Sequence, residues 1–185
     1  MKNINKLGKV VTKILEVFHC GAAALLAAAS VCSQVAPQWL VLFVDLDVKE
    51  CCGTELEVYG FQIMAPTVDG NVDLTSFLLF SIGGTLILIL MAMVFRDLHL
   101  IFKNSENASP FQPDNIRMMK EIGIFAIAVP VIGFIMSVII RLVTGVESAE
   151  ISLDLGGILL GIIVLSLTQF FVHGAALEED VDGLL

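Results

Sequence analysis

Residues 75–94 read TSFLLFSIGGTLILILMAMV, an uncharged and mainly apolar stretch that is long enough to cross a membrane. A spanning helix needs about 20 apolar residues, because the hydrocarbon is roughly 30 Å thick and each residue rises about 1.5 Å. Three further stretches meet this requirement: Val10–Val35, Ile122–Val143 and Ile151–Val172. The sequence therefore predicts an all-α membrane protein built as a bundle of four transmembrane helices.

The composition of the chain agrees with this class. Of its 185 residues, 57% are hydrophobic and only 16% are charged, which is too apolar for an ordinary soluble domain. We expect one integral membrane domain over residues 1–185, with helices at about 10–35, 75–98, 116–143 and 151–173. The lipid bilayer is then the first partner. A net charge of −9 argues against direct binding to nucleic acid, whose phosphates attract basic surfaces.

The basic residues predict the orientation of the bundle, because loops rich in Lys and Arg stay on the cytoplasmic side. Eight of the ten basic residues lie before the first span or between the second and third: Lys2, Lys6, Lys9, Lys13, Arg96, Lys103, Arg117 and Lys120. Only Lys49 and Arg141 lie on the other side. Both termini are therefore expected in the cytoplasm, with a long outer loop at about residues 36–73.

The outer loop carries the alternating pattern of a half-buried strand in two places, Leu42–Val48 and Glu55–Tyr59. Residues 50–53, Glu-Cys-Cys-Gly, can form the turn between them, so we expect a small extracytoplasmic β-hairpin. Its carboxylates are candidates to bind a cationic ligand or peptide, and the alternative is a solvated strand face. The candidate residues are Asp45, Asp47, Glu55 and Glu57.

Three cysteines, Cys32, Cys51 and Cys52, fall on the outer side, where disulfides persist. A bond from Cys32 to either of the other two would fasten the hairpin to the first span. Three cysteines leave one unpaired, so the disulfide pattern stays open. Nothing around these cysteines has the pattern of a catalytic thiol.

Several residues have structural interpretations. Small residues at Gly157-x-x-x-Gly161 allow close helix packing, either within the chain or in a homodimer. Pro130 removes a backbone hydrogen bond inside the third span, which predicts a kink. Arg141 and Asp154 flank the short outer loop, and an ion pair between them would hold the third and fourth spans together.

Three histidines fall toward the predicted cytoplasmic side: His19, His99 and His173. Imidazole binds Zn²⁺ and copper ions, so these residues could form a metal site if three helices brought them together. No paired spacing such as HxxxH supports that, and the alternative is interfacial histidines bonded to carbonyls or lipid headgroups. We expect no cofactor. The sequence contains no phosphate loop, HExxH helix or nucleophilic triad, so we name no catalytic residue.

The centre of the membrane is almost uncharged, which argues against an ion-coupled carrier. A channel or carrier for a lipophilic or cationic solute would need a polar path, for which the sequence offers Ser137, Ser166 and Gln169. Each of these side chains can equally form a hydrogen bond to a neighbouring helix.

One region of the sequence is similar to a known family. Ile101-Phe102-Lys103-Asn104, then Ser109-Pro110-Phe111, then Asn115-Ile116-Arg117-Met118-Met119-Lys120-Glu121-Ile122-Gly123 resembles the central motif of domain of unknown function 2975. The acidic end, Leu177-Glu178-Glu179-Asp180, is also similar, whereas Asp182-Gly183-Leu184-Leu185 departs from the family's usual Asp-Leu-Thr. That family is an uncharacterised group of bacterial four-helix membrane proteins.

The resemblance implies a multi-pass protein of the bacterial cytoplasmic membrane, often encoded beside small helix-turn-helix regulators. Phe111, Asn115 and Arg117 match the motif and become candidate partner-binding residues, with helix capping and loop packing as the alternative. The first hypothesis is thus a non-enzymatic sensory or regulatory protein, whose acidic outer loop receives a ligand and whose inner loop and tail contact a cytoplasmic partner. A small channel or carrier is the second hypothesis, and a metal-dependent membrane enzyme is the third. No motif in the sequence identifies the ligand or the oligomeric state.

Overall fold

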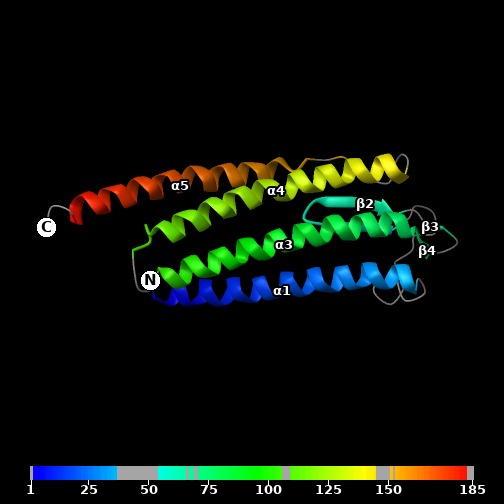
Figure 1. The fold of residues 1–185 in the computed structure, drawn as a ribbon, viewed down its shortest axis with the longest axis horizontal. Coiled ribbons are helices and arrows are strands. Elements are labelled where there is room, and N and C mark those ends of the chain that lie inside the picture. The colour runs from blue at the N-terminus through cyan, green and yellow to red at the C-terminus, as the bar shows by residue number, and fades with distance from the viewer. Residues whose placement is uncertain are drawn as a thin grey trace. The chain divides into compact units, whose positions relative to one another are not determined.

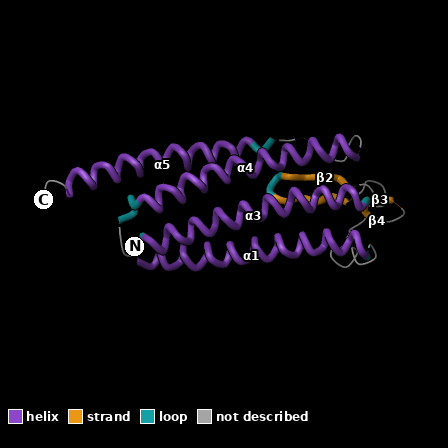
Figure 2. The backbone as a smooth tube through the Cα atoms, in the orientation of Figure 1, coloured by secondary structure: helices purple, strands orange, loops and turns teal. Residues whose placement is uncertain are grey.

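The structure, a computed structural model, describes residues 2–36, 54–65, 67–68, 71–105, 109–144, 151 and 153–182. Within these residues it has four long helices: α1 (Lys2–Val35), α3 (Leu74–Asn104), α4 (Pro113–Thr144) and α5 (Leu155–Asp182) (Figures 1 and 2). All four are long and apolar enough to cross a membrane. The predicted helical class is confirmed. α1, α3 and α4 reach beyond their predicted bounds, whereas α5 begins and ends later than the predicted range of about 151–173.

The starts of α3 and α4 follow from local sequence. Asp73 caps α3, because its Oδ2 accepts a hydrogen bond of 2.8 Å from the backbone amide of Ser76. Pro113 opens α4, where the missing amide hydrogen costs nothing, and Asp114 places a carboxylate at the positive end of that helix.

The loop before α3 contains a β-hairpin, but its strands differ from the prediction. β1 (Thr54–Val58) pairs with β2 (Phe61–Ala65), not with Leu42–Val48. Tyr59 and Gly60 form the connection, with φ angles of 51° and 76°. Positive φ at both turn residues is typical of the tight turn that matches the strand twist. The predicted partner strand and the predicted turn at residues 50–53 lie outside the described residues.

A second, shorter pair consists of β3 (Thr67–Val68) and β4 (Asn71–Val72), which leads into α3. The chain divides into two compact units. The first comprises Met1–His19, Leu90–Ala128 and Leu155–Leu185, and the second comprises Cys20–Ile89 and Val129–Asp154. Three helices, α1, α3 and α4, contribute residues to both units.

In the first unit, glycines mark the places where helices approach closely. A Cβ at Gly8 of α1 would lie 2.8 Å from the ring of Phe102 of α3. At Gly161 of α5 a Cβ would lie 2.7 Å from the carbonyl oxygen of Gly123 of α4. Gly161 therefore supports packing of α5 on α4 within the chain.

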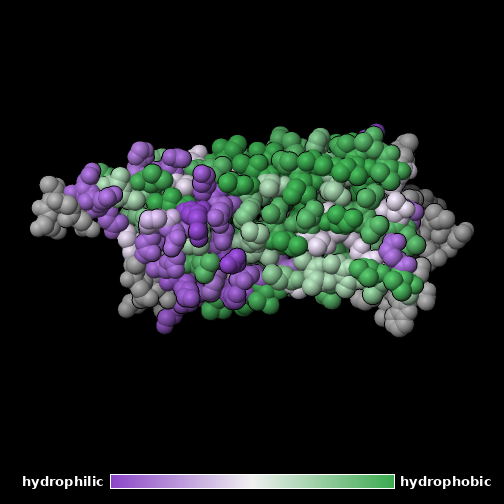
Figure 3. All heavy atoms as spheres, in the orientation of Figure 1, coloured by the Kyte–Doolittle hydropathy of each residue, from purple (hydrophilic) through white to green (hydrophobic). Residues whose placement is uncertain are grey.

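The surface of the first unit changes from polar to apolar along its helices. In Figure 3, hydrophilic residues gather where α1 and α4 begin and where α3 ends, while hydrophobic residues cover much of the visible part of α5. Exposed residues of α5 include Leu159, Leu160 and Phe170. An apolar helix with so little buried surface fits a lipid environment.

The second unit is built around the hairpin. Phe61 and Ile63 of β2 are buried, and the ring of Phe61 stacks on Phe80 of α3 with ring centroids 5.3 Å apart. A Cβ at Gly83 of α3 would lie 2.9 Å from the Phe61 ring, and one at Gly133 of α4 would lie 3.3 Å from the Phe61 Cβ. Two helix glycines therefore make room for one aromatic side chain of the hairpin.

The two faces of the hairpin differ in polarity. Cross-strand partners share a face, so Leu56 lies beside Ile63 and Val58 beside Phe61 on the side packed against the helices. The opposite face carries Glu57, whose partner in the register is Gln62. The alternation in sequence thus buries one face of the hairpin and leaves the acidic face exposed.

Candidate functional site

The connection between α3 and α4 packs on α5. The ring of Phe111 lies 5.4 Å from the ring of Phe171, centroid to centroid. A Cβ at Gly174 would lie 2.7 Å from Phe111 Cε1, so only glycine leaves room for the aromatic ring. The Ser109 hydroxyl donates a hydrogen bond of 2.6 Å to Glu178 Oε2. The connection is therefore held to α5 by both an apolar and a polar contact.

Asn115 is a buried polar residue that joins three segments. Its side chain is fully buried, and its Oδ1 accepts a hydrogen bond of 3.2 Å from Asn104 Nδ2 at the end of α3. Its own Nδ2 donates to the backbone oxygen of Pro110 over 3.2 Å. A buried amide satisfied in this way fixes local geometry, because leaving either partner unpaired is costly.

Arg117 differs from the other two candidate partner-binding residues, because its side chain is 68% exposed. Its Nε lies 3.6 Å from Glu121 Oε1, and one Nη lies 4.0 Å from Asp114 Oδ1. The structure thus engages Phe111 and Asn115 in packing and capping inside the chain, and it presents Arg117 on the surface. A partner would reach the guanidinium first.

Two of the four carboxylates predicted for the outer loop lie within the described residues. Glu55 accepts a hydrogen bond from Gln62 Nε2, and Glu57 is exposed on the same face of the hairpin. Asp45 and Asp47 lie outside the described residues. The structure therefore brings Glu55 and Glu57 together on one face.

The turn of this hairpin meets the chain just before α5. A Cβ at Gly60 would lie 3.9 Å from the Asp154 Cβ. Partial burial raises the pKa of the Tyr59 phenol above its ordinary value of 10.0, so the hydroxyl keeps its proton at neutral pH. Arg141 lies exposed in the last turn of α4, and its ion pair with Asp154 stays a prediction. Cys32 is exposed, and its predicted partners Cys51 and Cys52 lie outside the described residues.

Pro130 lies inside α4, three residues before Gly133, whose missing side chain makes room for Phe61. Gly157 lies in the first turn of α5, one helical turn before Gly161, and is half-buried. The predicted kink and the packing role of Gly157 stay predictions.

The histidines have separate surroundings. His19 is buried, with Nδ1 2.7 Å from the Leu15 carbonyl oxygen and its ring against Phe95. His99 Nδ1 lies 2.9 Å from the carbonyl oxygen of Lys9, and His173 is exposed. Among the described residues, no group of three or more His, Cys, Asp or Glu side chains is placed to hold a metal ion. The carbonyl contacts match the alternative given for interfacial histidines.

The three polar residues proposed for a transport path have different surroundings. Ser166 donates to the carbonyl of Ile162 over 2.9 Å, Ser137 is buried, and Gln169 is exposed. At the predicted cytoplasmic end, Lys13 and Glu16 of α1 form a helix-spaced ion pair, with Nζ and Oε1 2.9 Å apart.

One pair of acidic residues was missed at the sequence level. Asp97 of α3 is only 6% exposed, and its Oδ2 is buried without a hydrogen-bond partner. Glu121 of α4 is near enough for its charge to act on the Asp97 carboxyl. The sequence does show that each acid borders a long apolar stretch. It does not show how each helix is rotated about its axis, and that rotation decides whether the two acids come near each other.

No family model, curated protein or solved structure matches the chain. The similarity to domain of unknown function 2975 therefore stays a prediction. What is shown is a multi-helical chain with four candidate membrane spans, a hairpin packed on two of them, and a polar connection between those same two helices.

Proposed function

We propose that this chain is a non-enzymatic, multi-pass membrane protein that relays a signal from the hairpin to the α3–α4 connection. One observation carries the proposal: Phe61 of the hairpin is held between Gly83 of α3 and Gly133 of α4. A displacement of the hairpin therefore acts on both helices. Close-packed interfaces shift between discrete arrangements rather than deform smoothly, which suits them to transmission.

The same two helices end at the polar connection. Within the first unit, α3 ends at Asn104 and α4 begins at Pro113, and the Asn104–Asn115 hydrogen bond joins them. A change in the spacing of α3 and α4 would strain this bond and the seat of Phe111 on α5. The surface around Arg117 is then the part of the chain to which a partner protein would bind.

The acidic face of the hairpin is the proposed receiving surface. Glu55 and Glu57 lie on the exposed face, so a cationic ligand or peptide would bind there by charge complementarity. The basic residues favour an extracytoplasmic hairpin and a cytoplasmic connection. The family resemblance suggests a bacterial cytoplasmic membrane and a small helix-turn-helix regulator as the partner.

Hydrogen exchange of the full chain in lipid nanodiscs tests the coupling. The variant Phe61→Ala removes the ring held by α3 and α4, while Met64→Ala changes an exposed residue of the same strand. The reporters are the amides of Phe111 and Ile116, which donate to Ser109 Oγ and the Gln112 carbonyl oxygen. We expect several-fold faster exchange of both amides in Phe61→Ala only, with the central amides of α5 unchanged. Unchanged reporters would refute the relay.

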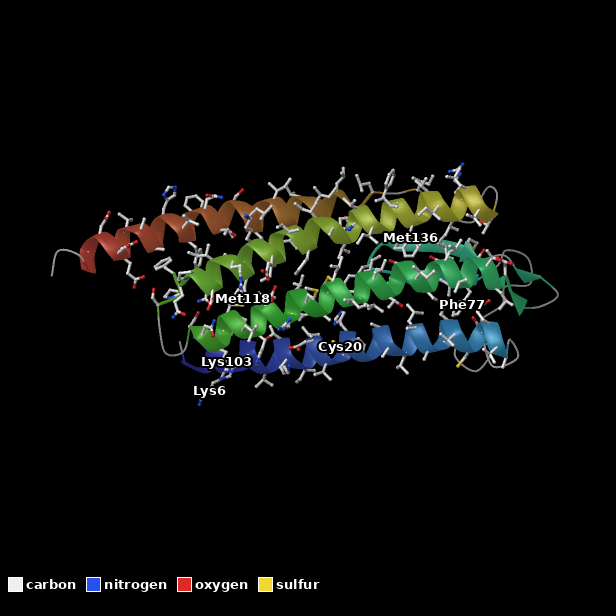
Figure 4. All side chains as sticks on the ribbon, viewed as in Figure 1. Lys6, Cys20, Phe77, Lys103, Met118 and Met136 are labelled. Atoms are coloured by element: carbon white, nitrogen blue, oxygen red, sulfur yellow. The ribbon has the colours of Figure 1, made fainter. Side chains whose placement is uncertain are left out.

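Native mass spectrometry of protein extracted from its own membrane tests the partner. We expect a co-isolated protein with the wild-type chain, and its loss in Arg117→Glu. Lys6→Glu is the matched charge reversal on α1, whose side chain points away from the helices (Figure 4). A chain that carries only a small molecule or a metal ion would instead favour the transport or enzyme hypotheses.

A further inference from the structure

The first helix, α1, is an element that the proposed relay does not use. It has 34 residues and so measures about 51 Å, whereas the hydrocarbon of a bilayer is roughly 30 Å thick. Residues 17–35 contain no Asp, Glu, Lys or Arg, which suits them to the hydrocarbon. The N-terminal part of α1 therefore projects into the region of the lipid headgroups.

The rotation of this part of α1 is set by its contacts with α3. A Cβ at Gly8 would lie 2.8 Å from the ring of Phe102, and His99 Nδ1 lies 2.9 Å from the carbonyl oxygen of Lys9. Thr12, one helical turn after Gly8, is buried. One face of α1 is thus fixed against α3, and the other faces stay open.

Two strips of side chains run along the open faces. Lys6, Lys9 and Lys13 recur at helical spacing and so form a basic stripe on one side of α1. The residue after each lysine is apolar and more than half exposed, which gives a parallel apolar strip of Leu7, Val10 and Ile14. The projecting part of α1 therefore presents positive charge and apolar surface side by side.

Lys6 and Lys13 can both donate to a further anion. Lys6 points away from the helices (Figure 4), and among the described residues it forms no ion pair. Lys13 contacts Glu16, but its side chain is 52% exposed and an ammonium group has three donors. Lys103, next to Phe102 in the last turn of α3, adds an exposed lysine at the same end of the α1–α3 pair.

A phospholipid at the membrane boundary matches both strips. Its phosphate accepts hydrogen bonds from ammonium groups, and its acyl chain covers apolar side chains that would otherwise face water. A soluble acidic partner would pair with the lysines and leave the apolar strip uncovered. An anionic headgroup fits better than a zwitterionic one, because the cation of a zwitterionic lipid opposes the lysines.

We propose that α1 carries a binding site for an anionic phospholipid. The basic stripe holds the phosphate of the headgroup, and the apolar strip lies along the acyl chain. The site uses neither the hairpin nor Arg117. Lys6→Glu should therefore release the lipid and keep a protein partner at Arg117, so the lipid site and the proposed relay can fail separately.

Native mass spectrometry of the full chain in a neutral detergent tests this site. The chain is titrated with phosphatidylglycerol, or with phosphatidylcholine of the same acyl chains, and we expect tighter binding of phosphatidylglycerol. Lys6→Gln and Lys13→Gln should each weaken that binding about five-fold, the effect of removing one lysine near an anionic surface. Lys120→Gln, at an exposed lysine of α4, is the matched control and should bind as the wild type does. Val10→Thr keeps shape and charge but makes the apolar strip more polar, so it should weaken binding several-fold.

Three results would overturn the proposal. Equal affinity for the two lipids would show that the headgroup is not selected. An equal loss in Lys120→Gln would show that net charge, and not the basic stripe, attracts the lipid. Unchanged binding in Val10→Thr, with displacement of the lipid by inorganic phosphate, would show a site for a free anion instead. Circular dichroism of each variant checks folding, and Gln has a helix propensity close to that of Lys.

Discussion

Asn115 has no contact with solvent, and its amide group bonds the end of α3 and the connection before α4 at once. Replacing it by Leu would leave Asn104 Nδ2 and the Pro110 carbonyl without this partner. We expect a loss of about 1–3 kcal/mol in the free energy of unfolding. Met118→Leu, a buried substitution of similar volume one turn later, should cost less than about 1.5 kcal/mol. Thermal unfolding in mild detergent would measure both, and equal losses would contradict the argument.

Gly161 gives a second prediction for a single residue. A Cβ there would overlap Ile127 and lie 2.7 Å from the backbone oxygen of Gly123, so Gly161→Ala must push α5 away from α4. We expect a loss of about 1–3 kcal/mol, the usual effect of overpacking. Gly21→Ala is the control, because no atom outside the local backbone lies within 4 Å of its Cβ position. That change should be neutral or stabilise α1 by up to about 1 kcal/mol. Similar melting shifts in both variants would argue against close packing at Gly161.

At the scale of the element, the hairpin should depend on one side chain. Phe61 is buried against Phe80 and two helix glycines, so Phe61→Ala leaves a cavity and should cost about 3–5 kcal/mol. Met64→Ala, on the exposed face, should cost much less. Limited proteolysis within residues 54–65 would report the difference, with faster cleavage expected for Phe61→Ala alone. Equal cleavage rates would mean that the hairpin is held by other contacts.

Only one of the two strands of the hairpin could be predicted from the sequence. The pattern at Glu55–Tyr59 correctly indicated a strand. Its partner Phe61–Ala65 was not recognised, because Gln62 is its only polar residue and the segment lacks a clear alternation. Tyr59-Gly60 is a poor turn signal by composition, because a bulky aromatic residue rarely adopts positive φ. The contact of Phe61 with α3 and α4 explains why this turn is adopted, and such a contact cannot be read from a local pattern.

The helices, by contrast, were predictable because each apolar stretch is a local property of the chain. The starts of α3 and α4 also follow from single residues, Asp73 and Pro113. The proximity of Asp97 to Glu121 was not predictable, since it depends on how two helices are rotated about their axes. The same limit applies to Phe111, whose neighbour Gly174 lies far along the sequence.

For the whole molecule, the basic residues predict that the two chain ends lie on one side and the hairpin on the other. In a chain with all four cysteines changed to serine, single cysteines would replace three exposed residues: Lys6, Glu179 and Glu57. A membrane-impermeant maleimide should label Glu57→Cys in intact cells, and Lys6→Cys and Glu179→Cys only after the membrane is opened. Labelling of all three in intact cells would contradict the predicted topology.

The position of Phe61 between α3 and α4 also constrains the order in which the protein is made. The hairpin leaves the ribosome before either helix, yet half of its binding surface, Gly133, is synthesised about 70 residues later. Until α4 has been made, the apolar face of the hairpin has no finished site to occupy. A chain that stops after α3 would leave that face uncovered on the α4 side, so the packing site of the hairpin is complete only when the third long helix has been made.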